Sequence, residues 1–256
     1  MPTATPHFLI TGAGTGIGRA ITLRLAARGA AVSLLGRTEA TLRETEALAK
    51  HAGAANTAVV LADIRDRVQV NTATATAVTT LGPLKGIIAN SGIGGPNIPG
   101  DHDRFDDLIQ TNLIGTYSCL RAAQRHLSTA ETTYMVVISS ILGRFGVPGY
   151  TGYCASKTAL LGLVRALALE LAEQDVHVNA VCPGWVDTEM AHEGLEGMAK
   201  GMQIPIDEAK AIAMKAVPMG RMSEPEDIAG LVAWLTSPDS RGVTGQGIDM
   251  NGGAWM

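Results

Sequence analysis

The sequence predicts an α/β fold of the doubly wound class, with one parallel sheet of seven strands and helices on both of its faces. Seven short, apolar, β-rich runs alternate with longer segments of helical period. Parallel pairing needs crossover connections, and right-handed crossovers place the connecting helices over the two faces of the sheet. The chain has 256 residues, 46% of them hydrophobic, and no Pro/Ser-rich linker or charge run divides it, so residues 1–256 are expected to form a single domain.

The alternation gives the order of the strands and helices along the chain. Strands are predicted at residues 8–11, 31–36, 57–63, 84–92, 133–140, 176–184 and 245–250. Helices are predicted at residues 17–28, 39–51, 68–81, 105–127, 153–174 and 225–235. Ligands of such sheets bind beyond the carboxyl ends of the strands, so functional residues are expected in the loops that follow the strands.

Composition and charge exclude several classes of function. The formal charge is −4 and the basic residues are scattered, which predicts no nucleic-acid partner. No apolar run reaches the ~20 residues of a membrane span and the first residues do not resemble a signal peptide, so a soluble cytoplasmic protein without a membrane partner is expected. Three widely spaced cysteines, Cys119, Cys154 and Cys182, predict neither a metal site nor disulfides and are interpreted as small buried side chains.

The first predicted strand leads into a glycine-rich turn, Thr11-Gly12-Ala13-Gly14-Thr15-Gly16-Ile17-Gly18. Glycines allow a tight turn, a close approach of the backbone to a pyrophosphate, and close packing of helix on strand, with the anion at the helix N-terminus. A flexible turn without a ligand is the alternative, but the strand before it and the helix after it supply the context that the motif needs. The turn therefore predicts a Rossmann-type dinucleotide site that includes Gly12, Thr15, Gly16, Ile17 and Gly18.

The end of the second strand bears on the choice between NADP(H) and NAD(H). An acidic residue there would bind the adenosine ribose and repel a 2′-phosphate. The chain has Gly36-Arg37 instead, which offers a guanidinium with room beside it for a phosphate. If Arg37 is only a solvated surface residue, the preference stays open. The prediction is NADP(H) over NAD(H).

Tyr153 and Lys157 stand four residues apart in a predicted helix, so both side chains lie on one face. An adjacent ammonium lowers the pKa of a tyrosine from about 10 by favouring the phenolate. Ser139 and Ser140 both end the fifth strand, where a hydroxyl could donate to a carbonyl oxygen while Tyr153 supplies a proton. These residues predict an oxidoreductase that interconverts a carbonyl compound and a secondary alcohol.

Together these motifs resemble the short-chain dehydrogenase/reductase family over essentially the whole chain. The matching segments follow in family order: the TGxxxGxG turn at 11–18, Asn90-Ser91-Gly92, Asn112, Ser140, Tyr153 to Lys157, and Pro183-Gly184 with Thr188. The resemblance implies a catalytic set of Asn112, Ser140, Tyr153 and Lys157, with Ser139 in support of Ser140. In that set Asn112 anchors a water molecule to Lys157, and Lys157 also holds the nicotinamide ribose.

The resemblance implies further cofactor contacts as well. These are Asp63 and Ile64 near the adenine, Asn90 and Gly92 after the fourth strand, and Pro183, Gly184, Val186 and Thr188 near the nicotinamide carboxamide and phosphates, besides Arg37, Tyr153 and Lys157. The chain departs from the family at two places. Thr15 stands where many NADP-dependent relatives carry a basic residue, and Ala89-Asn90-Ser91-Gly92 replaces the more common Asn-Asn-Ala-Gly.

Residues 189–217 form a Met-rich insertion that we interpret as a substrate lid. Flexible thioethers beside glycine hinges suit a segment that folds over an apolar substrate, and the hinges would be Gly194, Gly197 and Gly201. The alternative is an ordinary amphipathic pair of surface helices. Phe145, Val147 and Tyr150 are expected to line the opposite wall.

The substrate itself stays open at this point. The C-terminal VTGQGIDMNGGAWM looks like the ketoreductases of fatty-acid and polyketide synthesis, which act on 3-oxoacyl thioesters. Relatives that dock an acyl-carrier protein tend to carry arginines in a region where this chain has no Lys or Arg, His126 to Ile141. A free ketone, an alcohol or a coenzyme-A ester therefore remains as open as a carrier-bound substrate. An NAD-dependent secondary-alcohol dehydrogenase and a non-catalytic cofactor-binding regulator are the competing hypotheses.

The helix that begins near Tyr153 is apolar around most of its circumference, which indicates that it is buried against more than its own sheet. A subunit interface is the simplest account of this pattern. Since members of the resembling family are mostly homotetramers, a homotetramer is expected.

Overall fold

The computed structural model describes residues 5–256 and contains a seven-stranded parallel sheet in the order β3-β2-β1-β4-β5-β6-β7. The strands are β1 (His7–Thr11), β2 (Ala31–Gly36), β3 (Asn56–Leu61), β4 (Gly86–Ala89), β5 (Thr133–Ile138), β6 (Val176–Pro183) and β7 (Gly247–Met250). Every neighbouring pair is parallel. The predicted fold class is therefore confirmed.

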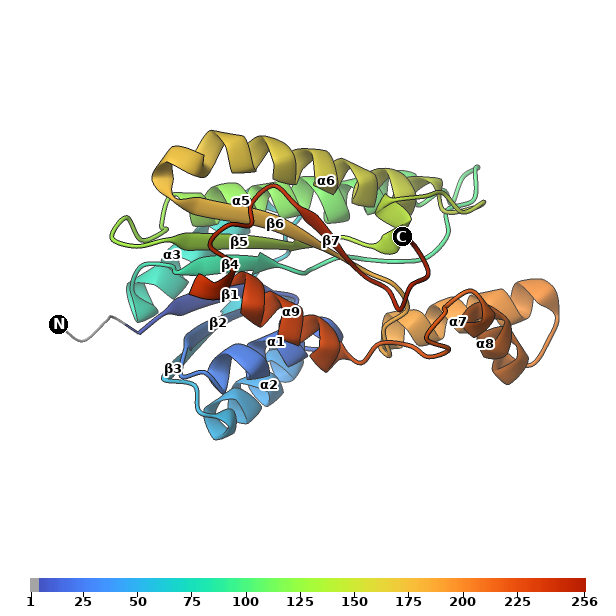
Figure 1. Cartoon of the computed structure of the whole chain (residues 1–256), viewed down its shortest axis with the longest axis horizontal. Helices are drawn as coiled ribbons and strands as arrows, with labels where there is room; N and C mark the ends of the chain where they lie inside the picture. Colours follow the sequence, from blue (N-terminus) through green and yellow to red (C-terminus); the bar gives the residue numbers. More distant parts are fainter. Residues whose placement is uncertain (1–4) are drawn as a thin grey trace.

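Helices cover both faces of this sheet (Figure 1). They are α1 (Gly16–Ala26), α2 (Glu39–Ala52), α3 (Arg67–Leu81), α4 (Phe105–Ile109), α5 (Thr116–Gln124), α6 (Thr151–Leu171), α7 (Glu189–Met202), α8 (Ile206–Lys215) and α9 (Pro225–Leu235). One core lies on the side of α3, α5 and α6, and the other lies on the side of α1, α2 and α9. Neighbouring strand residues alternate between them, since Leu9 belongs to the first core and Ile10 to the second. This alternation explains why the strands are apolar throughout.

The sheet order reverses direction at β1, which has β2 on one side and β4 on the other. Connections from these central strands leave toward opposite faces, so the turns after β1 and β4 diverge and leave a crevice at their carboxyl ends. The glycine-rich turn follows β1, and Asn90 to Gly92 follow β4. The crevice is thus bordered by two of the predicted motifs.

Most predicted elements differ by one to three residues at their ends, and two differ more in length. The strand predicted at 84–92 is shorter, because the backbone N–H groups of Asn90 and Ser91 donate to the Thr11 hydroxyl (3.0 and 2.9 Å). The helix predicted at 105–127 has three parts, α4, a π-helical segment at Gln110–Gly115, and α5. Short π segments are frequent at functional sites because they change the direction in which side chains point. Asn112 lies within this one.

Two of the exclusions can be compared with the structure. None of the helices within residues 5–256 combines the length and the apolar character needed to cross a membrane. Cys119 and Cys182 are buried as predicted, whereas Cys154 is partly exposed.

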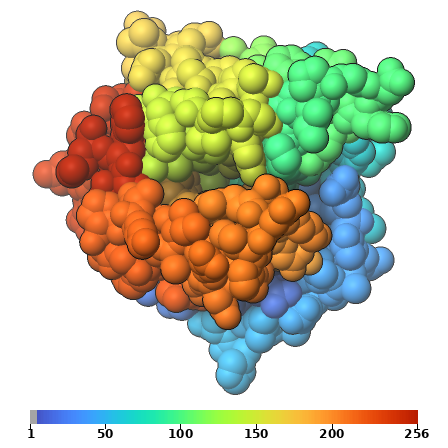
Figure 2. Space-filling view, turned by 90° about the vertical axis from the view of Figure 1, so that its right-hand side faces the viewer, coloured from blue at the N-terminus to red at the C-terminus, as the bar shows by residue number. Residues whose placement is uncertain are grey.

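The insertion at 189–217 forms α7 and α8, which stand apart from the two layers of helices, beyond the carboxyl ends of the strands (Figure 1). Leu195, Ala213 and Met222 form a small core there, against which Met198 and Met214 pack. The predicted glycine hinges are wrong, because Gly194, Gly197 and Gly201 lie inside α7. Figure 2 faces this edge of the molecule and shows the orange helices below the yellow-green segment that leads into α6, with a hollow between them.

Candidate active site

The glycine-rich turn has the conformation that its sequence requires. Gly12 and Gly16 have φ angles of 65° and 50°, in the left-handed region that favours glycine. A Cβ at Gly18 would lie far inside van der Waals distance of the Gly12 carbonyl oxygen, so only glycine lets α1 pack this closely on the turn. Among the described residues, Thr15 at the N-cap makes no side-chain bond to the first turn of α1. The helix N-terminus therefore keeps backbone N–H groups for an anion.

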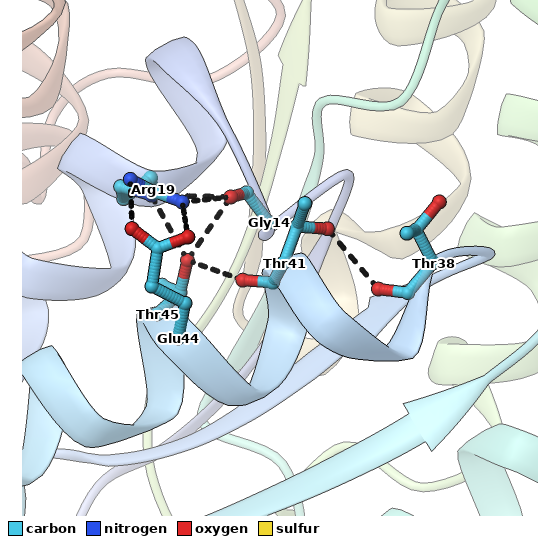
Figure 3. Close-up of polar contacts among 6 residues, drawn as sticks. All are labelled: Gly14, Arg19, Thr38, Thr41, Glu44 and Thr45. Carbon is cyan, nitrogen blue, oxygen red and sulfur yellow. Dashed lines mark hydrogen bonds and ion pairs between the residues drawn. The ribbon is translucent and has the colours of Figure 1, made fainter.

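Arg19 braces this turn against α2, a role that the sequence did not reveal (Figure 3). Its guanidinium donates twice to the Gly14 carbonyl oxygen, at 3.1 and 2.8 Å, and pairs with Glu44 at 3.0 Å. The Thr45 hydroxyl donates to the same carbonyl at 3.1 Å. A Cβ at Gly14 would lie 2.5 Å from the Thr41 hydroxyl oxygen, so α2 also leaves room only for glycine here. The turn is thus held in one conformation before any ligand binds.

A Gly18→Ala variant is expected to bind the dinucleotide at least ~100-fold more weakly and to lose about 1–3 kcal/mol of unfolding free energy, because α1 must move away from Gly12. Cofactor titration and urea denaturation measure the two effects. Gly230→Ala in α9 is the matched control, since a Cβ there would meet nothing within 4 Å and alanine favours a helix by up to ~1 kcal/mol. Unchanged cofactor affinity in Gly18→Ala would contradict the predicted role of the turn.

Asn90 joins the two central turns of the sheet. Its side-chain amide donates to the carbonyl oxygens of Thr11 and Gly12 at 3.1 and 3.2 Å. Ser91, which departs from the family pattern, uses its backbone N–H for the bond to Thr11. The predicted cofactor residue Asn90 therefore shapes the crevice by holding the glycine turn.

The predicted adenosine end of the site combines Arg37, Asp63 and Ile64. Arg37 follows β2 with 63% of its side chain exposed, 4.0 Å from Asp63. Asp63 is held more closely by Arg65, at 2.6 Å, and these hydrogen bonds keep the pKa of the Asp63 carboxyl below its usual range. Ile64 is buried, and a Cβ at Gly115 would lie 2.8 Å from it, so it packs under the π-helical segment. Arg37 thus remains accessible to a ligand.

Ser140 and Tyr153 approach one another at the end of β5 and the start of α6. Ser140 is the N-cap of a 3-10 turn at Ile141–Gly143, and its hydroxyl oxygen accepts from the Leu142 N–H at 3.1 Å. Burial raises the pKa of Tyr153, while a hydrogen bond from Ser140 opposes this rise. The net direction is opposite to the one predicted from Lys157, because burial disfavours the phenolate more than the hydrogen bond favours it.

Lys157 lies one turn after Tyr153, with its Nζ 5.7 Å from the centre of the Tyr153 ring. Its side chain is buried, and the ammonium donates to the Ile138 carbonyl oxygen at the end of β5 (3.0 Å). Burial lowers the pKa of Lys157 to about 8. The Ser139 hydroxyl donates to the Lys157 backbone carbonyl at 2.9 Å, so Ser139 joins the end of β5 to α6.

Asn112 completes the convergence from the π-helical segment. Its Oδ1 accepts from the Ile93 N–H at 2.8 Å, and its Nδ2 donates to the Ile93 carbonyl (3.0 Å) and to the Ser156 hydroxyl (3.1 Å). The Asn112 Oδ1 and the Lys157 Nζ lie 3.1 and 3.4 Å from the point that a Cβ of Gly92 would take. Because Gly92 has no side chain, a small gap remains between the Asn112 amide oxygen and the Lys157 ammonium.

The segment after β6 reaches the glycine turn. Gly184 packs so closely on Asn251 that a Cβ would lie 3.0 Å from the Asn251 Cα. Val186 is buried and its carbonyl accepts from the Thr188 hydroxyl at 3.2 Å. Thr188 caps α7, and its Cγ2 lies 3.2 Å from the point that a Cβ of Gly16 would take. Of the predicted residues in this segment, Thr188 borders the turn after β1, while Gly184 packs on Asn251 and Pro183 ends β6.

Two apolar contacts border the outer part of this region. Met190 of α7 would lie 2.9 Å from a Cβ at Gly94, so α7 touches the loop after β4. Phe145 stacks on Trp255 near the C-terminus, with ring centres 5.4 Å apart. Arg144, next to Phe145, donates to Asp249 at 3.0 Å and to the Gly247 carbonyl at 2.6 Å, which ties the turn after Ser140 to β7.

The chain has residues that fit a dinucleotide. The glycine turn offers backbone N–H groups at a helix N-terminus, and exposed Arg37 follows the next strand. Gly92, Lys157 and Thr188 lie around the same crevice farther along the sheet edge. The four predicted catalytic residues come from the turn after β5, from α6 and from the π-helical segment, and the contacts above bring them to this edge.

Comparisons with known proteins agree with this geometry. Residues 12–254 match the family described as Enoyl-(Acyl carrier protein) reductase, a short-chain dehydrogenase/reductase family. The chain is 32% identical to the 3-oxoacyl-[acyl-carrier-protein] reductase FabG of Staphylococcus aureus, over 98% of this chain and 99% of the relative. It is 34% identical to a monensin polyketide synthase putative ketoacyl reductase of Streptomyces virginiae, over 96% and 95% of the two chains.

Solved structures are similar over the same extent. A variant of actinorhodin polyketide ketoreductase with NADPH has a TM-score of 0.92 and 32% identity, over 98% of this chain and 97% of that chain. NAD+-bound xylitol dehydrogenase has a TM-score of 0.91 and 28% identity, over 99% and 100%. Relatives with either cofactor thus share the fold.

Proposed function

Because the chain belongs to the short-chain dehydrogenase/reductase family of oxidoreductases, we propose that it is an NADP(H)-dependent enzyme that interconverts a ketone and a secondary alcohol. The observation that carries the proposal is the convergence of Ser140, Tyr153, Lys157 and Asn112 at the crevice. Each of these side chains alone has a structural explanation. Four of them at one sheet edge, beside a dinucleotide turn, favour catalysis.

The Ser140 and Tyr153 hydroxyls would hold the substrate carbonyl oxygen between them. When bound, the cofactor supplies a hydride, which is two electrons and one hydrogen nucleus, to the carbonyl carbon. Tyr153 then gives its phenolic proton to the alkoxide oxygen, so that carbonyl, hydride and proton together make the alcohol. Because burial raises the pKa of Tyr153, the phenol is held protonated, the form that reduction requires.

Lys157 and Asn112 would return that proton. The Lys157 ammonium, one turn from Tyr153, favours the phenolate that remains after transfer. Its pKa of about 8 makes the lysine itself able to release a proton near neutral pH. The Asn112 amide and Lys157 border the gap at Gly92, where a water molecule could extend the relay.

The preference for NADP(H) is tested by an Arg37→Ala variant. We expect kcat/KM with NADPH to fall ~10–100-fold, because the guanidinium would pair with the 2′-phosphate, while kcat/KM with NADH changes less than about threefold. Arg24→Ala is the matched control, since Arg24 is an exposed arginine in the last turn of α1, away from the glycine turn. A wild-type enzyme that strongly prefers NADH would favour the alternative, an NAD-dependent alcohol dehydrogenase, which the likeness to xylitol dehydrogenase supports.

The proposed substrate is an apolar ketone. The likeness to ketoreductases of fatty-acid and polyketide synthesis supports a 3-oxo compound, and α7 with Met190 supports a lid over the site. A panel of free ketones, secondary alcohols and 3-oxoacyl thioesters, followed by the absorbance of the reduced cofactor, tests the proposal. Turnover of any one of these three classes of compound supports the proposed oxidoreductase activity. Tight NADPH binding without turnover of any class would favour a cofactor-binding regulator.

The oligomeric state that we propose is a homotetramer. Helix α6 lies on the outside of its layer, and Leu169 on it is 83% exposed (Figure 1). Gly162 and Ala166 are exposed on the same face of the helix, and a second subunit would cover this apolar stripe.

A further inference from the structure

Asn97 is a buried asparagine in a loop whose other residues are half-buried or exposed. The loop runs from Asn90 to Arg104 after β4, and its next residue, Ile98, is 73% exposed, whereas Asn97 is only 4% exposed. A buried amide must have its donors and its acceptor paired, or it costs free energy. The partners of Asn97 therefore show why it is buried.

Those partners belong to the start of α6. The Asn97 Oδ1 accepts from the Gly152 N–H at 2.8 Å and from the Thr151 hydroxyl at 3.1 Å. The Asn97 backbone N–H donates to the Gly149 carbonyl oxygen at 2.8 Å. Asn97 thus bonds to three of the four residues that precede Tyr153, across more than fifty positions of sequence.

The first turn of α6 depends on this amide. Tyr150 stands at the N-cap, and within residues 5–256 its side chain makes no capping bond. A helix start leaves its first N–H groups without intrahelical partners, and a capping oxygen normally comes from the N-cap residue itself. Here the oxygen comes from Asn97, and the residue after the capped Gly152 N–H is Tyr153.

The other side of the Asn97 amide is fixed as well. Its Nδ2 donates to the Asp103 carboxylate at 3.0 Å, and the same carboxylate oxygen accepts from the Phe105 N–H at the start of α4. Helix α4 packs directly on α6, since a Cβ at Gly152 would lie 3.2 Å from the Phe105 Cα. Asn97 is therefore held by contacts with both α4 and α6, so its side chain has a fixed position.

We propose that Asn97 is a positioning residue that fixes the first turn of α6 and thereby the place of the Tyr153 hydroxyl relative to Ser140. The proposal rests on the proposed function, because it assumes that Tyr153 is the proton donor. Asn97 itself touches neither Ser140 nor the Tyr153 side chain by any contact that the described residues show. Its effect should consequently appear in kcat and hardly in cofactor binding.

The test compares four enzymes at a temperature well below their unfolding transitions: wild type, Asn97→Ala, Asn97→Asp, and Asn97→Asp combined with Asp103→Asn. Asn97→Ala removes the cap, and we expect kcat to fall ~10–100-fold with the Kd for NADPH changed less than about twofold. Asn97→Asp keeps the acceptor for Gly152 but places a second carboxylate beside Asp103, so kcat should fall to an intermediate value. The added Asp103→Asn removes that repulsion and supplies an amide donor, and should restore kcat to within about threefold of wild type.

Asn179→Ala is the matched control for the loss of a buried amide. Asn179 in β6 is also buried and also joins backbone groups, accepting from the Gln246 N–H at 3.0 Å and donating to the Val243 carbonyl at 2.8 Å. It should lower the unfolding temperature while kcat stays within about twofold of wild type. Equal losses of kcat in Asn97→Ala and Asn179→Ala would overturn the proposal, and so would a double variant no more active than Asn97→Asp. An inactive wild type would instead refute the proposed function.

Discussion

A Tyr153→Phe variant is expected to lose about 1,000-fold in kcat while its affinity for NADPH changes less than about threefold. The substitution removes one hydroxyl, and with it the proton that the alkoxide would receive, and proton transfer by a positioned side chain is worth ~10²–10⁴ in rate. The ring itself stays in place beside Lys157. Stopped-assay turnover measures kcat, and quenching of tryptophan fluorescence, with Trp185 in the segment after β6, measures NADPH binding.

Tyr134→Phe is the control for the loss of a buried tyrosine hydroxyl. Tyr134 stands near the amino end of β5, about 15 Å or more along the strand from Ser140. This variant should turn over substrate at the wild-type rate. Undiminished turnover by Tyr153→Phe would remove the catalytic assignment and leave the regulator hypothesis.

A Lys157→Met variant is expected to lose at least ~1,000-fold in kcat and yet to unfold less readily at pH 7. Burial lowers the pKa of Lys157 from 10.5 to about 8, which corresponds to about 3 kcal/mol of unfavourable free energy in the charged folded state. Methionine has a similar length and no charge, but it leaves the Ile138 carbonyl oxygen without its donor, at a cost of about 1 kcal/mol. A net gain of ~1–2 kcal/mol in unfolding free energy should remain.

The pH dependence separates this cause from simple packing. Between about pH 8 and 10.5 the unfolded chain binds the Lys157 proton and the folded chain has released it, so the unfolding free energy of the wild type rises with pH in this window. Below pH 8 the lysine is charged in both states and the full penalty is present. The advantage of Lys157→Met over the wild type should therefore be largest at pH 7 and should shrink toward pH 10.

Urea denaturation of both proteins without cofactor, at one protomer concentration, measures this difference at pH 7, 8.5 and 10. Taking the difference removes the contribution of the other titrating groups, which the two proteins share. A difference that stays constant across this range would show that the buried ammonium is not the cause.

The fold class and the order of the elements could be predicted from the amino-acid sequence. Alternation of short apolar runs with helical segments is a local property, and the burial of both Leu9 and Ile10 confirms that the strands are covered on two faces. It also predicted which residues follow the strands, because a parallel sheet brings its carboxyl ends to one edge. The glycine-rich turn could be recognised in the sequence because its backbone requires glycine. Gly12 has a positive φ angle, and Gly18 packs too closely on the turn to carry a side chain.

How those residues are held follows from packing in three dimensions. Arg19 braces Gly14 through α2, and Asn97 caps a helix that begins more than fifty residues later; neither contact has a sequence spacing that predicts it. The π-helical segment around Asn112 and the helical state of Gly194, Gly197 and Gly201 depend on packing that overrides local propensity. The rise in the pKa of Tyr153 likewise follows from burial, and burial cannot be predicted from the four-residue spacing between Tyr153 and Lys157. Such contacts join elements that are distant along the chain, so they exist only once the sheet has brought its carboxyl ends together.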